Sequence, residues 1–196
     1  MCIRDRRSDN AKFDFLSAFS KSKGSNIIYP GDLLHVDFGI TYLGLNTDTQ
    51  QLAYVIKENE NDAQTELKAP LKLGKELQDI LTNEFVTGRS GNKILKLALK
   101  KAKSSGIKPQ IYTHPIGYYG HGSGPTIGMW DKQEGVPING DYPLYPNTAF
   151  SIELNAKFYI KSCNKEIAIM LEEDAYFDGK ETKYIDPRQT ELILIK

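Results

Sequence analysis

The sequence lacks the features that mark several large classes of protein. Its 196 residues include two cysteines, Cys2 and Cys163, too few for a disulfide framework or for a zinc site built on several cysteines. It has no excess charge, with 25 Lys and Arg against 25 Asp and Glu, so no nucleic-acid partner is expected. It also has no run of about 18 apolar residues, so no membrane partner is expected. These absences leave a soluble, cytoplasmic chain of one globular domain, or two at most.

The N-terminal segment, residues 1–25, has no clear helix or strand pattern. Charges at Arg4, Asp5, Arg6 and Arg7 stand where a signal peptide needs an apolar stretch. We therefore expect a poorly defined segment, either a cloning scar or a truncated element. One folded domain then covers residues 26–196.

Hydrophobic patterning predicts an α+β domain. We expect a β-hairpin, two amphipathic helices, a long structured loop rich in Gly and Pro, a second hairpin and a last strand, over residues 26–38 with 46–56, 62–85, 92–103, 114–147, 148–160 with 166–177, and 191–195. Long loops inside compact domains are usually functional, so residues 114–147 are the first place to look for chemistry.

Carboxylates interrupt both predicted hairpins, on strands that otherwise bury apolar side chains. A first turn at Tyr42–Leu43 would place Asp37 opposite Asp48, and the second hairpin would place Glu153 opposite Glu172. Like charges held this close either share a proton or surround a cation. The simpler alternative for each carboxylate alone is an exposed strand residue or a turn cap.

Glu173 is an alternative to Glu172. The register above puts the second turn at Ser162–Cys163. Because strand side chains alternate, Glu173 shares its face with apolar residues such as Leu171, whereas Glu172 lies on the other face. We prefer Glu172 for the site and leave Glu173 open.

The loop adds two imidazoles, His114 and His121. Four carboxylates and one imidazole suit two divalent ions of hard-to-borderline character. Two such ions can together lower the pKa of one water molecule and polarise a carbonyl, which is metal-assisted hydrolysis. Which histidine is the ligand, and whether either is merely bonded to backbone, stays open at this point.

The order Asp, Asp, His, Glu, Glu resembles the pita-bread metallopeptidases, the family of methionine aminopeptidase, Xaa-Pro aminopeptidase and prolidase. The resemblance covers about residues 26–196 and rests on Gly31–Gly39 (GDLLHVDFG), Thr47–Asp48, His114, His121, Ser151–Glu153 and Leu171–Asp174. The runs Asp48–Tyr54 and Glu172–Asp174 are more similar to the Xaa-Pro type. The resemblance implies an α+β pita-bread fold, which we expect to be truncated at its N-terminus.

The resemblance also implies roles for the ligands. Asp37 would chelate one ion, whereas Asp48 and Glu172 would bridge both. His114 and Glu153 would complete the second ion, and Glu153 would also accept a proton from the attacking water. The family uses manganese, cobalt, iron or zinc, and manganese is the ion we expect.

Substrate contacts are implied for the loop. His121 follows His114 by seven residues, the family spacing of a histidine that contacts substrate and stabilises the oxyanion. Tyr118 and Trp130 would line the substrate pocket, with a plain packing role as the alternative. His35 shares a strand face with Asp37 and would either support it or pack in the core.

The sequence therefore predicts a dinuclear metal-dependent aminopeptidase of the Xaa-Pro type, with catalytic residues His121 and Glu153. Its partner would be a peptide substrate, and a homodimer stays open. The alternatives are a non-catalytic pita-bread module that binds peptides and a creatinase-like amidinohydrolase, which works without metal.

Overall fold

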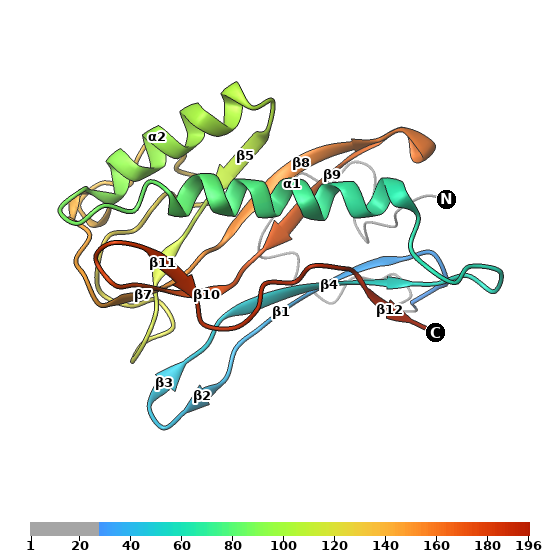
Figure 1. Ribbon diagram of the computed structural model, residues 1–196, viewed down its shortest axis with the longest axis horizontal. Coiled ribbons are helices and arrows are strands. Elements are labelled where there is room, and N and C mark those ends of the chain that lie inside the picture. Colours follow the sequence, from blue (N-terminus) through green and yellow to red (C-terminus); the bar gives the residue numbers. More distant parts are fainter. Residues whose placement is uncertain (1–27) are drawn as a thin grey trace.

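The computed structural model describes residues 28–196 and shows the predicted α+β architecture (Figure 1). The segment 1–25 and the first two residues of the first predicted strand lie outside the described residues. The elements are β1 (Leu33–Phe38), β2 (Thr41–Tyr42), β3 (Leu45–Asn46), β4 (Thr49–Val55), α1 (Thr65–Thr82), α2 (Gly91–Ser104), β5 (Lys108–Ile111), β6 (His114–Pro115), β7 (Thr148–Ser151), β8 (Leu154–Ile160), β9 (Lys165–Leu171), β10 (Asp174–Phe177), β11 (Thr182–Tyr184) and β12 (Ile193–Ile195).

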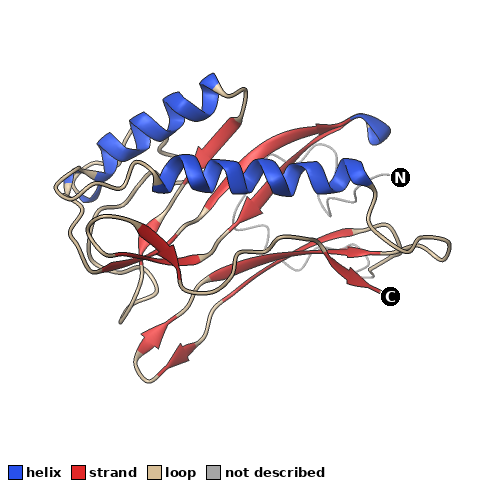
Figure 2. Cartoon of the chain, viewed as in Figure 1, coloured by secondary structure: helices blue, strands red, loops and turns tan. Residues whose placement is uncertain are grey.

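The strands form small sheets that share one core. Their orders are β1-β4-β12, β11-β10-β7-β6 and β5-β8-β9, with β2 and β3 paired as a separate arm. Both helices lie on the same side of the strands (Figure 2), and the β2–β3 arm projects away from them (Figure 1). Neither helix in the described part of the chain is long and apolar enough to cross a membrane.

The two helices occupy the predicted positions because each has one apolar face. Leu67, Leu77 and Leu81 of α1 are each at most 1% exposed, as are Ile94 and Leu95 of α2. The Ser90 hydroxyl caps α2 by accepting the amide proton of Lys93 at 3.3 Å. The helices therefore close the core over the β8–β9 hairpin.

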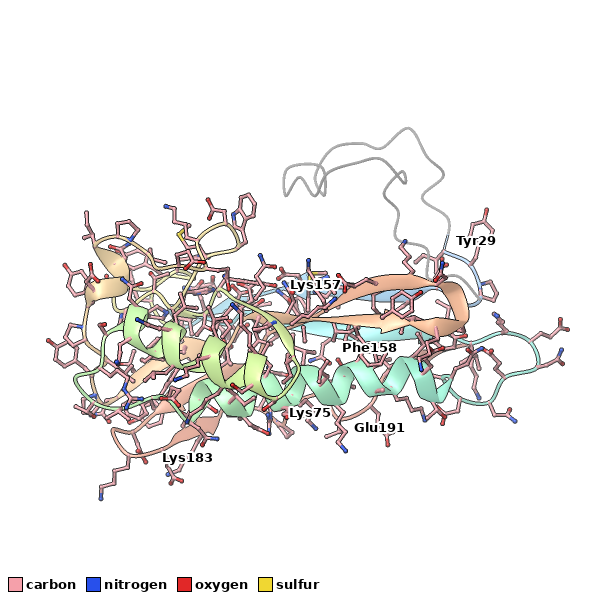
Figure 3. The ribbon with its side chains drawn as sticks, turned by 90° about the horizontal axis from the view of Figure 1, so that it is seen from above. Tyr29, Lys75, Lys157, Phe158, Lys183 and Glu191 are labelled. Atoms are coloured by element: carbon pink, nitrogen blue, oxygen red, sulfur yellow. The ribbon has the colours of Figure 1, made fainter. Side chains whose placement is uncertain are left out.

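The packing of α1 on this hairpin follows the alternation of the strand. Phe158 of β8 lies between the hairpin and α1, whereas Lys157 lies on the other side and is exposed (Figure 3). Successive strand side chains point to opposite faces, so one face of β8 can be apolar and covered while the other is polar. This layer supports the strand ends where the carboxylates lie.

The register predicted for the first hairpin is wrong. Asp37 of β1 pairs with Gln50 of β4, not with Asp48. The turn lies at Leu43–Gly44, where both residues have positive φ, 50° and 81°. A two-residue turn of this kind favours glycine, so Gly44 rather than Tyr42 decides its position. The error is two residues, so it leaves every side chain on its predicted face.

The register predicted for the second hairpin is confirmed. Leu154 of β8 pairs with Leu171 of β9, and Ser151 of β7 pairs with Asp174 of β10. The ladder breaks between these pairs, at residues 152–153 and 172–173, and the strands on its two sides belong to different sheets. Both glutamates predicted for the site therefore lie where the hairpin passes from one sheet to the next.

The long loop contains more structure than its sequence predicts. Its first residues form β6, in which His114 pairs with Ser151 of β7. Strands β5 and β11 are also additional, whereas the final predicted strand exists as β12, parallel to β4. The pairing of β6 with β7 brings the first loop histidine beside the break in the second hairpin.

Candidate metal centre

The structure brings together all five residues predicted as metal ligands. They form two groups that share Glu172, and in each group one possible ligand atom from every residue lies within 4.8 Å of the others. The first group is Asp48, His114 and Glu172, and the second is Asp37, Glu153 and Glu172. We call them the histidine subsite and the carboxylate subsite. This grouping differs from the roles that the resemblance implies, because Glu153 lies with Asp37 rather than with His114, and Asp48 belongs to one group only. That these residues hold metal stays a prediction.

The ring of His114 is oriented as a metal ligand would be. Its Nδ1 lies 3.2 Å from the carbonyl oxygen of Pro115, so this nitrogen carries the proton and donates it. Its Nε2 lies 3.7 Å from Glu172 Oε1 and 4.0 Å from Asp48 Oδ2, too far for hydrogen bonds. His114 is 5% exposed, and within the described residues its Nε2 has no hydrogen-bond partner.

An unpaired nitrogen buried beside two carboxylates is costly unless something binds it. A divalent cation would satisfy the lone pair of the imidazole and both carboxylates at once. The residues of the histidine subsite therefore fit a divalent cation.

Glu172 is fixed from several directions. The Ser151 hydroxyl donates to its Oε1 at 2.5 Å, and the backbone amide of Gln50 donates to its carbonyl oxygen at 3.0 Å. The residue is 1% exposed. Its carboxylate thus has one oxygen facing each subsite, the geometry required of a group shared by both.

Gln50 completes the carboxylate subsite. Its Nε2 donates to Glu153 Oε1 and Glu172 Oε2, each at 2.8 Å, and lies 3.3 Å from Asp37 Oδ2. An amide nitrogen pointing into three carboxylates supplies part of the positive charge that they require. The sequence predictions did not include this residue.

The carboxyl groups of the site are hard to ionise together. Burial, followed by the charges of Glu172 and Asp37, raises the pKa of Asp48 to about 6. Burial and then Glu172 and Asp37 also raise the pKa of Glu153, and burial and then Glu172 raise the pKa of Asp37. The centre therefore has more negative charge than its surroundings compensate, and a cation would relieve it.

Glu173, the alternative to Glu172, is directed elsewhere. Its Oε1 accepts the backbone amide proton of Gln189 at 3.0 Å, and the Gln189 side chain in turn bonds both backbone groups of Leu52 in β4. Burial raises the pKa of Glu173 to about 7. Glu173 belongs to neither subsite and ties the C-terminal segment to the first hairpin.

His121 lies on the ring of His114. Their centroids are 4.1 Å apart and the planes differ by 19°, with His121 exposed and His114 buried. Burial, and then the neighbouring His114 ring, lowers the pKa of His121. His121 therefore lies at the open side of the histidine subsite as a mostly neutral ring that can donate a hydrogen bond.

The two predicted substrate contacts lie on separate parts of the surface. Tyr118 is 73% exposed, packs edge-on against Tyr119 and lies beside Gly44 in the arm. Trp130 is 47% exposed, in a turn whose backbone bonds the Gln110 side chain of β5. Their role in binding substrate stays a prediction.

Three polar neighbours of the ligands share one sequence signal. Gln50, Asp174 and Ser151 each stand two residues from a predicted ligand, so the period of a strand puts them on the same face. Asp174 Oδ2 accepts the backbone amide proton of Asp48 at 3.2 Å.

The same two-residue spacing relates His35 to Asp37. His35 is exposed and bonds Gln50 Oε1 at 2.9 Å, so the alternative of a packed core histidine is wrong.

The fold and this cluster fit the class of metal-dependent hydrolases. The model of metallopeptidase family M24 matches residues 10–178, and the chain belongs to this family. No curated protein matches the chain significantly.

Solved structures of the family show the same fold. An X-Pro aminopeptidase from Thermotoga maritima MSB8 is 19% identical, with a TM-score of 0.64 over 86% of this chain and 42% of the other. An Xaa-Pro dipeptidase from Bacillus anthracis is 21% identical, with a TM-score of 0.62 over 88% and 44%. A methionine aminopeptidase from Rickettsia prowazekii is 16% identical, with a TM-score of 0.57 over 79% and 64%. The chain thus spans about two fifths of the length of the first two.

Proposed function

We propose that this chain carries the active site of an aminopeptidase that hydrolyses the N-terminal peptide bond of peptides, with Xaa-Pro sequences as substrates. Two divalent ions, manganese by preference, would be held by Asp37, Asp48, His114, Glu153 and Glu172. The observation that carries the proposal is the buried Nε2 of His114 beside Asp48 and Glu172, which has no hydrogen-bond partner among residues 28–196. The X-Pro aminopeptidase and Xaa-Pro dipeptidase among the similar structures support this substrate class.

The chemistry would be divided between the ions and the chain. Bound divalent ions would lower the pKa of water and polarise the scissile carbonyl. Glu153 would accept the proton of the attacking water, because its carboxyl group lies in the carboxylate subsite. His121 would donate a hydrogen bond to the carbonyl oxygen as negative charge develops there.

A second candidate is a module that binds peptides without cleaving them. The observation in its favour is the Gln50 amide, which pairs with three carboxylates without any metal. The two candidates differ in one requirement. Catalysis needs ions, whereas a binding module does not.

Elemental analysis and a peptidase assay on Xaa-Pro peptides separate the two candidates. We expect divalent metal in the purified protein and cleavage that a chelator abolishes. Asp48→Asn should lose both, because Asp48 belongs to the histidine subsite. The matched control is Asp62→Asn, a surface carboxylate paired with Lys68, which should retain both.

Two results would contradict the proposal. Absence of metal at micromolar supply would rule out the metal-dependent aminopeptidase. Equal cleavage by the wild type and Asp48→Asn would place the activity elsewhere in the preparation.

A further inference from the structure

The face of the β5-β8-β9 sheet beside the candidate metal centre carries neutral polar side chains that belong to neither subsite. Asn155 of β8 stands two residues beyond Glu153 and pairs with Gln110 of β5. Its side chain lies on the face of β8 away from α1, the side on which Figure 3 shows Lys157. Two residues of a strand span about 7 Å, so Asn155 is the next side chain after Glu153 on this face.

A chain of hydrogen bonds fixes the orientation of the Asn155 amide. The backbone carbonyl oxygen of Trp130 can only accept, so Gln110 presents its NH₂ group to it. The oxygen of Gln110 therefore faces Asn155, whose Nδ2 donates to it at 2.7 Å. The same Nδ2 lies 3.3 Å from the hydroxyl oxygen of Tyr112, which accepts its second proton. Both amide protons of Asn155 are thus used on the β5 side.

The oxygen of the same amide lacks a donor. Asn155 is 6% exposed, and no residue in the described part of the chain donates a hydrogen bond to its Oδ1. Because the nitrogen is directed to β5, the oxygen is directed to the β9 side, where Met170 stands opposite. A buried carbonyl oxygen without a donor is costly, and an unbranched methionine side chain can move to admit one. The sheet therefore offers a neutral acceptor to a ligand that supplies an N–H group.

The charge and position of this oxygen select the N–H group that fits it. An ammonium group binds a carboxylate more strongly than a neutral oxygen, so a neutral acceptor suits a main-chain N–H. When proline follows the scissile bond, its nitrogen carries no proton, and the first main-chain N–H beyond the scissile carbonyl belongs to the third residue. In an extended peptide this N–H lies about 5 Å beyond that carbonyl. With the scissile carbonyl beside Glu153, it comes within side-chain reach of Asn155.

We propose that Oδ1 of Asn155 accepts the main-chain N–H of the third substrate residue, so that peptides of three or more residues are preferred to dipeptides. A dipeptide such as Ala-Pro has no such N–H. It would bring its C-terminal carboxylate to this position instead, with oxygen facing oxygen. Asn155 contacts the substrate but takes no part in breaking the bond. This inference rests on the proposed function, because it requires the scissile carbonyl at the metal centre.

The test removes the N–H group from the substrate as well as the acceptor from the protein. The value of kcat/KM is measured for the full chain with Mn²⁺ on Ala-Pro-Gly and on Ala-Pro-sarcosine, in which a methyl group replaces that proton. We expect the wild type to cleave the methylated peptide, and also Ala-Pro, about tenfold less efficiently than Ala-Pro-Gly. In Asn155→Leu, the values for Ala-Pro-Gly and Ala-Pro-sarcosine should differ by less than about twofold.

Asn139→Leu is the matched control. The side chain of Asn139 is exposed, in the segment Asn139–Asp141, so this variant should distinguish the peptides as the wild type does. Asn155→Leu should bind as much Mn²⁺ as the wild type, because Asn155 belongs to neither subsite. Asn155→Ala is a second variant with the same expected result, for use if the leucine does not fit.

Two outcomes would overturn the inference while leaving the proposed function intact. Equal cleavage of Ala-Pro-Gly and Ala-Pro-sarcosine by the wild type would mean that no acceptor for this N–H matters. A tenfold difference that persists in both Asn155 variants would mean that the bulk of the methyl group causes it. If the wild type cleaves none of the three peptides, the proposed function fails, and the inference fails with it.

Discussion

The first and second hairpins supply the same kind of side chain to the centre but are stabilised differently. In the second hairpin and its continuation, Phe150 and Leu154 are fully buried, under helices and neighbouring strands. In the first hairpin, Val36 and Phe38 of β1 are 50% and 55% exposed. Only β4 of the first hairpin has fully buried side chains, such as Tyr54. Both strands of the second hairpin are therefore positioned by buried side chains, whereas β1 depends on its backbone pairing with β4 and on the turn between them. The centre lies where the two meet.

The largest effect should come from the residue that both subsites share. Glu172→Gln, in the second hairpin, removes a charge from both subsites, whereas Asp37→Asn, in the first, changes only one. We expect Glu172→Gln to abolish metal binding and to lower peptidase activity by about 10⁴-fold or more, equivalent to ~5.5 kcal/mol. Asp37→Asn should retain one ion. Elemental analysis of the two proteins gives the comparison, and equal metal loss would show that the subsites are not separate.

The next effect concerns the free energy of unfolding. Phe150 is fully buried, with its ring 5.0 Å from that of Phe85, so Phe150→Ala should cost about 3–5 kcal/mol. Phe38→Ala should cost less than about 1 kcal/mol, because most of that side chain is already in water. Urea unfolding of both variants measures the difference. Similar losses would mean that another surface covers the first hairpin in solution.

Backbone substitutions should affect the first hairpin more than its exposed side chains do. A methyl group on Gly39 would lie 2.0 Å from the carbonyl oxygen of Thr47, next to Asp48, so Gly39→Ala must separate the two strands. We expect Gly39→Ala to cost ~2 kcal/mol or more and to weaken metal binding. Gly44→Ala has room but a φ of 81°, so it should cost about 1–2 kcal/mol with metal binding unchanged. Thermal melts with and without Mn²⁺ test both, and unchanged metal affinity in Gly39→Ala would contradict this view of the hairpin.

The same contrast explains which parts of the fold the sequence could predict. The second hairpin has one buried apolar face, and a register shifted by one residue would expose it, so the pattern around Glu153 and Glu172 specifies the pairing. The first hairpin has exposed apolar residues on β1, so its pattern does not specify the register. The position of Gly44 does, through the positive φ of its turn. Strands β5, β6 and β11 have at most four residues each, too short for a period to emerge.

The centre was predictable in its charged members and not in its neutral ones. Carboxylates on apolar strands are conspicuous, and their alternation favours Glu172 over Glu173 without deciding between them. Gln50 has no charge and stands in a polar run, so only its spacing from Asp48 marks it. Its importance comes from three carboxylates that reach it from other strands, which is a tertiary fact. Tyr118 and Trp130 are conspicuous in the sequence, but the sequence of a loop does not predict which residues an aromatic side chain contacts.

The smallest effect is on the pH dependence of the metal-free protein. Burial raises the folded-state pKa of Asp48 and Asp174 to about 6 and that of Glu173 to about 7. The folded state therefore holds these protons more tightly than the unfolded state does. Their contribution to stability is fully present below the ordinary pKa of a carboxyl group, about 4, and is lost as the pH rises through 6 and 7.

Melting temperatures of the metal-free chain should therefore fall as the pH rises from about 4 to 7. Mn²⁺ should reverse the trend, because ion binding requires the ionised carboxylates of both hairpins. A metal-free protein that instead becomes more stable between pH 5 and 8 would show that these carboxyl groups ionise freely and that the two hairpins do not crowd their charges.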